Sequence, residues 1–264
     1  MTKLPEFETI LLSRKGRRLT ITMNRPEALN AFGGPMHGEI IDAFAFAATD
    51  PGSDVIVVTG AGRAFSAGGD LGEMQEVMDN PDLFDREAVN AKRLIFTLLD
   101  IEKPVIARIN GPAVGLGATI ALFCDITFAS DRARIGDPHV SVGLVAGDGG
   151  AVIWPQLIGF HRAKEYLLIG EILTAQKAAE IGLVNHVLPE AELDAAVDAL
   201  CDRLLSGATQ AIRWTKVTMN IELKRIAHAL LDPGIAYEAL SVRTDDHRRL
   251  IGELSRKIGE KDKS

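Results

Sequence analysis

The segment Val55–Thr59 constrains the fold more than any other, because its consecutive apolar residues would be buried on both faces of a strand. Such a strand is typical of a mainly parallel sheet that helices cover on each side. Other β-branched stretches predict strands at Thr9–Leu12, Leu19–Met23, Val105–Asn110 and Asp125–Ala129. Helical periodicity falls between these strands, at Met36–Ala48 and Arg86–Asp100. The sequence therefore predicts an α/β fold.

After Gly159 the pattern changes to a succession of helices, predicted at Arg162–Leu168, Ala175–Ile181, Glu190–Leu205 and Thr209–Ala229. No Pro-rich or Ser-rich linker interrupts the 264 residues. We therefore expect one compact unit, in which residues 1–200 form the core and residues 201–264 form a C-terminal helical region. A charged stretch, residues 257–264, ends the chain.

Composition narrows the classes of partner. Asp and Glu outnumber Lys and Arg by 36 to 29, which argues against nucleic acid as a ligand. The longest nearly unbroken apolar run, Ala113–Cys124, is too short to span a bilayer, and the N-terminus lacks the apolar stretch of a secretory signal. Cys124 and Cys201 stand in apolar surroundings, so we expect buried thiols and a cytoplasmic protein with no membrane partner.

Glycine accounts for 25 residues and clusters within 60–69, 111–117 and 143–150. The first two clusters each follow a predicted strand and precede a helix, so their N–H groups would gather at the carboxyl edge of the sheet. Two such turns can direct one N–H each at a single oxygen, as in an oxyanion hole, although any one glycine can equally serve a tight turn. A dinucleotide fingerprint starting at Gly115 fails at its third glycine, where Ile120 stands.

Six motifs in order resemble the crotonase, or enoyl-CoA hydratase/isomerase, superfamily. They are NRPEALNA (24–31), AFSAGGDL (64–71), KPVIA (103–107), NGPAVGLG (110–117), CD (124–125) and AAEIGLVN (178–185). The resemblance implies a spiral of ββα units and a C-terminal helical region that mediates homotrimers, often paired into hexamers. It also implies an acyl-CoA thioester substrate, with coenzyme A as part of that substrate and no separate cofactor.

Carried over motif by motif, the resemblance implies that the backbone N–H groups of Gly69 and Leu116 hold the thioester oxygen. Leu116 replaces the glycine usual in hydratases, and we expect its side chain to narrow the acyl pocket. Substrate contacts, mostly through the backbone, are implied for Ala28, Ala67, Gly68, Asp70 and Leu71.

The chain departs from the hydratase pattern at both catalytic glutamates, where it has Thr119 and His139. Thr119 is then a substrate-binding candidate, since a hydroxyl is no base near neutral pH. His139, with an ordinary pKa near 6.5, is a candidate base, and Asp148 on a glycine-flanked turn is a candidate to fix its tautomer. The alternative is a structural histidine with Asp148 capping the helix expected near Ala151. We favour the His/Asp pair.

Residues 139–155 are also similar to the 6-oxocamphor hydrolase type of the superfamily, in which a His/Asp pair activates water to cleave a β-diketone without coenzyme A. Three functions follow: an acyl-CoA hydratase or isomerase, a β-diketone hydrolase, and a non-catalytic acyl-CoA-binding member. We favour the first. His37, His161 and His186 lack partners at ligand spacing and are expected at the surface or an interface, so no metal site is predicted.

Overall fold

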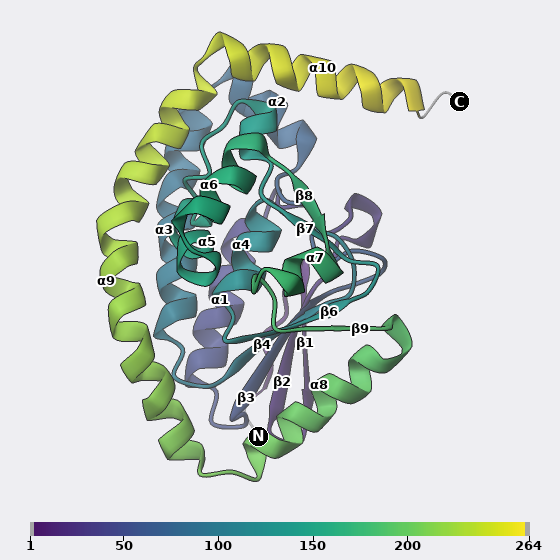
Figure 1. Ribbon diagram of the computed structural model, residues 1–264, viewed down its shortest axis with the longest axis vertical. Coiled ribbons are helices and arrows are strands. Elements are labelled where there is room, and N and C mark those ends of the chain that lie inside the picture. The colour runs from purple at the N-terminus through teal and green to yellow at the C-terminus, as the bar shows by residue number, and fades with distance from the viewer. Residues whose placement is uncertain (1–2, 262–264) are drawn as a thin grey trace.

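The computed structural model describes residues 3–261 and has a six-stranded sheet at its centre, in the order β1-β2-β3-β4-β6-β9 (Figure 1). Strands β1 and β2 form an antiparallel hairpin, and every later pair in this sheet is parallel. A second, three-stranded sheet has the order β5-β7-β8. The strands are β1 Ile10–Lys15, β2 Arg18–Met23, β3 Val55–Gly60, β4 Val105–Ile109, β5 Ala113–Val114, β6 Ile126–Ser130, β7 Arg134–Gly136, β8 Ile172–Thr174 and β9 His186–Leu188.

Helices alternate with these strands and then follow one another to the end of the described chain. They are α1 Met36–Thr49, α2 Leu71–Asp79, α3 Asp82–Asp100, α4 Leu116–Phe123, α5 Gly150–Ile158, α6 Phe160–Ile169, α7 Ala175–Glu180, α8 Glu190–Leu205, α9 Thr209–Val242 and α10 Asp245–Lys261, with short 3₁₀ turns η1 at Pro26–Ala28 and η2 at His139–Val142. The junction expected between residues 200 and 201 lies inside α8. Residues 262–264 of the expected charged stretch lie outside the described residues.

Strand β3 is buried at every position, as its apolar sequence predicts. Val55 and Val57 pack on one face of the sheet in a cluster that includes Leu193 of α8. Ile56 and Val58 face the opposite side and join the larger core with α1, α3 and α9. The α/β prediction is confirmed, and so is the burial of both cysteine thiols. Among the described helices, none has the length and apolar character that a membrane crossing requires.

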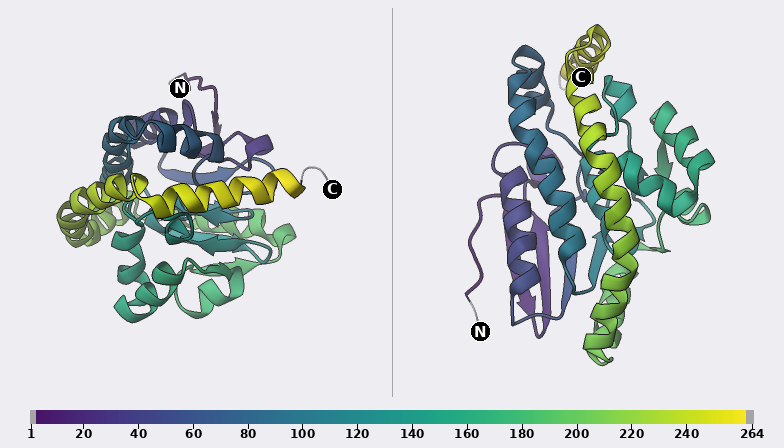
Figure 2. Two further views of the ribbon diagram at one scale, coloured as in Figure 1. Left: turned by 90° about the horizontal axis from the view of Figure 1, so that it is seen from above. Right: turned by 90° about the vertical axis from the view of Figure 1, so that its left-hand side faces the viewer.

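The C-terminal helices α9 and α10 pack against helices from the first half of the chain. Helix α9 lies beside α3, which in turn lies beside α1, and α10 turns away from the end of α9 and runs across α2 (Figures 1 and 2). The sequence predicted a helix only over Thr209–Ala229, but α9 continues through Pro233 to Val242. Proline inside a helix removes one backbone hydrogen bond, and here tertiary packing outweighs that loss.

Two asparagine side chains hold the first glycine turn. Asn30 Nδ2 donates to the carbonyls of Ala61 and Ala64, both at 2.9 Å. Asn110 Nδ2 donates to the carbonyls of Gly62 at 2.9 Å and Ala64 at 3.0 Å. Asn30 itself has a φ of +56°, which asparagine tolerates better than most residues. These bonds fix the loop that runs from β3 toward α2.

The third glycine cluster lies where the backbone meets the C-terminal helices too closely for a side chain. A Cβ on Gly143 would lie 2.7 Å from the Cα of His247 in α10. A Cβ on Gly147 would lie 2.3 Å from the carbonyl oxygen of Gly234 in α9. The loop 143–150 is therefore packed directly against backbone of both helices.

We predict that Gly147→Ala lowers the free energy of unfolding by about 1–3 kcal/mol, because the added methyl group must displace backbone of α9. Gly38→Ala is the matched control, since a Cβ at that position in α1 meets nothing within 4 Å and alanine favours a helix. Urea unfolding of both variants checks this. Equal stability of the two variants would contradict the close packing of the loop on α9.

Candidate active site

A backbone bridge between Ser66 and Ala113 brings the first and second glycine clusters together at the edge of the sheet. A second bridge joins Phe32 to Gly69 of the first cluster. Gly68 permits this approach, because a Cβ there would lie 2.8 Å from a backbone oxygen of the second cluster. The two loops that the sequence placed at one sheet edge are therefore neighbours.

Each loop presents one backbone N–H group. Phe32 N–H donates to Gly68 O at 2.7 Å, and Asp70 N–H donates to Phe32 O at 2.8 Å. The N–H of Gly69, between these two bonds, consequently points away from Phe32. Leu116 is the first residue of α4, where an N–H has no acceptor within the helix. Gly69 and Leu116 line the same cavity.

This cavity has a volume of about 140 Å³ and also contains the predicted His139 and Asp148. The ring of His139 lies against the second glycine cluster, with its Cε1 atom 3.6 Å from the position of a Cβ on Gly115. Most other lining residues are apolar. The structure thus brings together in one cavity the four residues predicted to carry the chemistry, His139, Asp148, Gly69 and Leu116.

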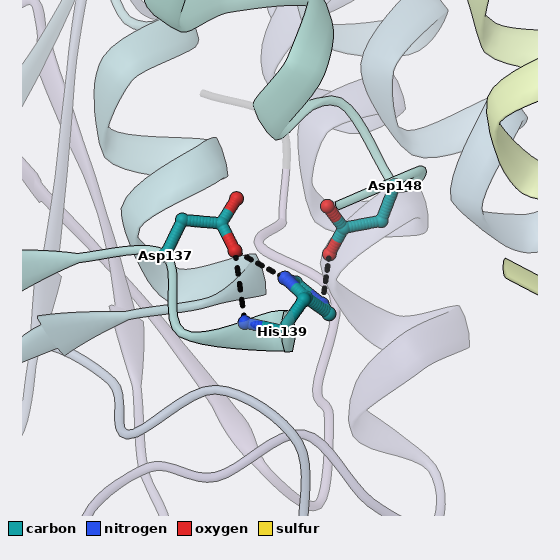
Figure 3. Close-up of side chains that lie close together, drawn as sticks. All are labelled: Asp137, His139 and Asp148. Carbon is teal, nitrogen blue, oxygen red and sulfur yellow. Dashed lines mark hydrogen bonds and ion pairs between the residues drawn. The ribbon is translucent and has the colours of Figure 1, made fainter. Parts of the chain in front are cut away.

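Carboxylates face both ring nitrogens of His139, which begins the short turn η2. Nδ1 is hydrogen-bonded to Asp137 Oδ1, and Nε2 lies 3.5 Å from Asp148 Oδ2 (Figure 3). A third carboxylate, Glu238 of α9, lies 3.9 Å from Nε2. The orienting contact at Nδ1 therefore comes from Asp137, two residues before the histidine, and not from Asp148 as the sequence suggested. Asp148 occupies the opposite side of the ring.

Asp148 is buried and has contacts besides His139. The Thr119 hydroxyl donates to Asp148 Oδ1 at 3.3 Å, so Thr119 positions this carboxylate from inside α4. The N–H of Gly150, the first residue of α5, also bonds to Asp148 and favours its charged form. Gly149, and not Asp148, occupies the N-cap position of α5, so the geometry places Asp148 beside His139 without making it the cap of that helix.

Burial and charge together set the proton affinities here. Burial alone would lower the pKa of His139, but the carboxylates, Asp137 foremost, outweigh it and raise that pKa well above its usual value. Burial raises the pKa of Asp148. Burial, and then the nearby Asp148 charge, raise the pKa of Glu238 to about 8. This direction favours the imidazolium form of His139 at neutral pH, whereas the ordinary pKa of histidine had suggested a largely neutral base.

The ligand atoms of Asp137, His139 and Asp148 lie within 4.8 Å of one another, a spacing that a cation also accepts. In this arrangement, however, each imidazole nitrogen already faces a carboxylate oxygen. The geometry is that of an ion-paired histidine.

The residues predicted to contact coenzyme A are arranged around the first glycine loop. Asp70 lines the cavity, but its side chain caps α2 by accepting from Gly72 N–H at 2.9 Å, and it pairs with Arg25 at 3.2 Å. The Ala67 N–H donates to Leu29 O. Ala28, Gly68 and Leu71 lie at the end of η1, inside the loop and at the start of α2, respectively.

Several cavity residues escaped the sequence analysis. Glu238 and His247 come from α9 and α10, and nothing in their local sequence marks them as part of the site. His37, expected at the surface or an interface, lines the cavity and lies 3.3 Å from Glu73 of α2. For Asp137 the sequence does contain a signal, because this carboxylate stands only two residues before the candidate histidine.

Comparisons with known proteins agree with this fold. The family model described as "Enoyl-CoA hydratase/isomerase" matches residues 15–237. A crotonyl-CoA hydratase of Syntrophomonas wolfei is 35% identical over 216 residues, covering 81% of this chain and 82% of that protein. A crystal structure of an enoyl-CoA hydratase/isomerase from Mycobacterium paratuberculosis has a TM-score of 0.88 and 38% identity, covering 93% of this chain and 98% of its own.

A β-diketone hydrolase from the cyanobacterium Anabaena, whose structure contains (S)-3-oxocyclohexyl acetic acid, is also similar. Its TM-score is 0.84 and its identity 32%, with 92% of this chain and 98% of that chain covered. The fold is thus that of the crotonase superfamily. The protein belongs to the enoyl-CoA hydratase/isomerase family and is an enzyme of the hydratase/isomerase type.

The raised pKa of Glu238 predicts how the stability of the folded protein changes with pH. Its carboxyl keeps its proton to a pH of about 8 in the folded protein, against an ordinary pKa of 4.5 when exposed. The folded state thus binds this proton more tightly, so the associated stability is full below pH 4.5 and is lost as the pH rises through about 8. We expect Glu238→Gln, which does not ionise, to gain on the order of 4 kcal/mol relative to wild type between about pH 5 and pH 9.

Urea unfolding at several pH values measures this gain. Glu222→Gln is the control on the same helix, because Glu222 is exposed and its pKa is lowered by Arg225. A wild-type and Glu238→Gln difference that stays constant with pH would show that Glu238 is already ionised in the folded protein.

Proposed function

We propose that the protein acts on an acyl-CoA thioester and stabilises its enolate in an oxyanion hole formed by the N–H groups of Gly69 and Leu116. The observation that carries this proposal is that both donors share one cavity with His139 and Asp148. An enolate oxygen gains more from two short backbone donors than a neutral carbonyl does, and loss of one such donor typically raises the barrier by about 3 kcal/mol.

In this proposal the proton moves between substrate or water and the carboxylate–imidazole cluster. Asp137 holds the Nδ1–H of His139, which directs the Nε2–H toward Asp148. With His139 already protonated, Asp148 is the proton acceptor, and burial makes it more basic than an exposed aspartate. Asp148 is neutral once it has taken the proton, and the negative charge then lies on the enolate oxygen that the N–H groups of Gly69 and Leu116 hold. Glu238, which carries a proton at neutral pH, is a candidate donor in the reverse direction.

We assign the coenzyme A contacts to the rim formed by η1, the first glycine loop and the start of α2, chiefly through backbone groups of Ala28, Ala67, Gly68 and Leu71. Asp70 contributes by capping α2 and so fixing the loop. Thr119 contributes by holding Asp148. Coenzyme A enters as part of the substrate, and the proposed steps use no other cofactor.

We predict that His139→Ala lowers kcat by about 100-fold or more, because it removes the charge that holds the carboxylates in place. Absorbance assays with crotonyl-CoA and a β,γ-enoyl-CoA give the measurement and separate hydration from double-bond migration. His161→Ala, exposed on α6, is the control and should keep full activity. Unchanged activity in His139→Ala would favour a site without acid–base catalysis, and no binding of any acyl-CoA in calorimetry would exclude the proposal.

A second candidate function is hydrolysis of a β-diketone without coenzyme A. The specific observation in its favour is the His139–Asp148 pair with a protonated Glu238 beside it, in a chain similar to the Anabaena β-diketone hydrolase. Here water would attack one carbonyl, the adjoining C–C bond would break, and the departing enolate would take up a proton. Turnover of cyclic 1,3-diketones without acyl-CoA turnover would select this function, and the reverse result would eliminate it.

We also propose that the chain assembles as a homotrimer or a hexamer of two trimers. Large apolar side chains remain exposed on the C-terminal helix α9, including Trp214, Met219, Ile221, Tyr237 and Leu240. Apolar side chains that stay exposed next to one another along a helix are typical of an interface. Light scattering on the purified protein should give three or six times the 28.4 kDa of one chain. A monomer would contradict the assembly.

A further inference from the structure

The catalytic cavity has one largely apolar wall. Val77 of α2, Leu144 of the glycine-rich loop and Val242 at the end of α9 form a separate buried cluster, with Phe84 of α3 packed against it. All four residues line the cavity that contains His139. This wall is therefore the surface that a substrate's carbon skeleton meets opposite the charged groups.

Hydrogen bonds from the C-terminal helices fix this wall in place. The buried His247 of α10 contacts the carbonyl oxygen of Val142 through Nδ1 at 2.6 Å. Further along α10, Ser255 accepts from the side chain of Gln75 in α2 at 2.8 Å. Arg243, between α9 and α10, donates to Asp85 of α3 at 2.9 Å. The wall is thus connected to α2, α3 and η2 and does not depend on one contact.

The volume of the cavity limits the size of the substrate group that it can hold. Its volume is about 140 Å³, close to the roughly 150 Å³ of an apolar protein cavity that accommodates one benzene molecule. A single six-membered ring or an acyl chain of about six carbons fills such a space. The cavity is partly open to solvent, so its volume limits only the part of a substrate that lies inside it. A longer chain or a second ring in that part has to displace the wall.

We propose that this wall makes the enzyme selective for short or single-ring carbonyl substrates, with about six carbon atoms inside the cavity, the reacting carbonyl included. The proposal builds on the proposed function, and it names the substrate class of the same site. Val242 and Phe84 are the residues that set the limit.

Two soluble probes test the limit without any assumption about the reaction. Phenol has one ring and 4-phenylphenol has two. We expect phenol to raise the melting temperature of wild type and 4-phenylphenol to leave it unchanged. Val242→Ala should admit both probes, and Phe84→Ala should do the same if Val242→Ala folds poorly. Val89→Ala makes the same chemical change at an exposed site on α3 and should behave as wild type. Equal binding of both probes to wild type, or no binding of phenol, would overturn the proposal.

Acyl-CoA substrates then separate this proposal from the proposed function. With crotonyl-CoA and trans-2-decenoyl-CoA, we expect kcat/KM of wild type to fall at least about 100-fold for the longer chain and to recover about tenfold or more in Val242→Ala. Equal kcat/KM for the two chains would overturn the size limit and leave the proposed function standing. If neither thioester binds but the two phenols are still discriminated, the size limit stands and the acyl-CoA function fails.

Discussion

The site depends on one nearly buried histidine held among three buried carboxyl groups. Burying a charge is unfavourable unless it is paired, and here Asp137, Asp148 and Glu238 surround the imidazole of His139. Burial, and then the charge of Asp148, raise the pKa of Glu238 to about 8, so this carboxyl keeps its proton at neutral pH. Unequal proton affinities in one cavity are what acid–base chemistry requires.

The three carboxylates come from distant parts of the chain, and the fold has to bring them together. Asp137 directly follows β7, Asp148 lies on the glycine-rich loop before α5, and Glu238 lies on α9. Gly147 allows that loop to meet α9 backbone to backbone, which places Asp148 and Glu238 on the same side of His139. The third glycine cluster is thus a packing feature that assembles the charged site, whereas the first two clusters position backbone donors.

The apolar periodicity and the motifs of the sequence predict several of the helices and strands and part of the candidate site. Strand β3, helix α1 and helix α8 appear close to where periodicity predicts them, because their apolar positions are buried as expected. The convergence of Gly69, Leu116, His139 and Asp148 on one cavity was also predicted, from the glycine clusters and the order of the family motifs. Their catalytic roles remain predictions.

What the sequence did not reveal depends on tertiary contacts. Glu238 lies in a region of α9 beyond the predicted end of the helix, after a proline that normally interrupts helical structure. Its position beside His139 follows from packing between α9 and the loop, which has no local signature. The raised pKa of His139 has no local sequence signal for the same reason, since an ordinary pKa takes no account of Asp137 and Glu238.

The proposed chemistry depends on His139 being an imidazolium held between carboxylates at neutral pH. Nitrogen-15 NMR of histidine-labelled protein measures this protonation, with the His139 signals assigned by comparison with a His139→Gln variant. We expect two protonated ring nitrogens at about pH 7, and a lower His139 pKa when Asp137→Asn removes the foremost charge. An unprotonated ring nitrogen on His139 at that pH would show that the histidine is not an imidazolium.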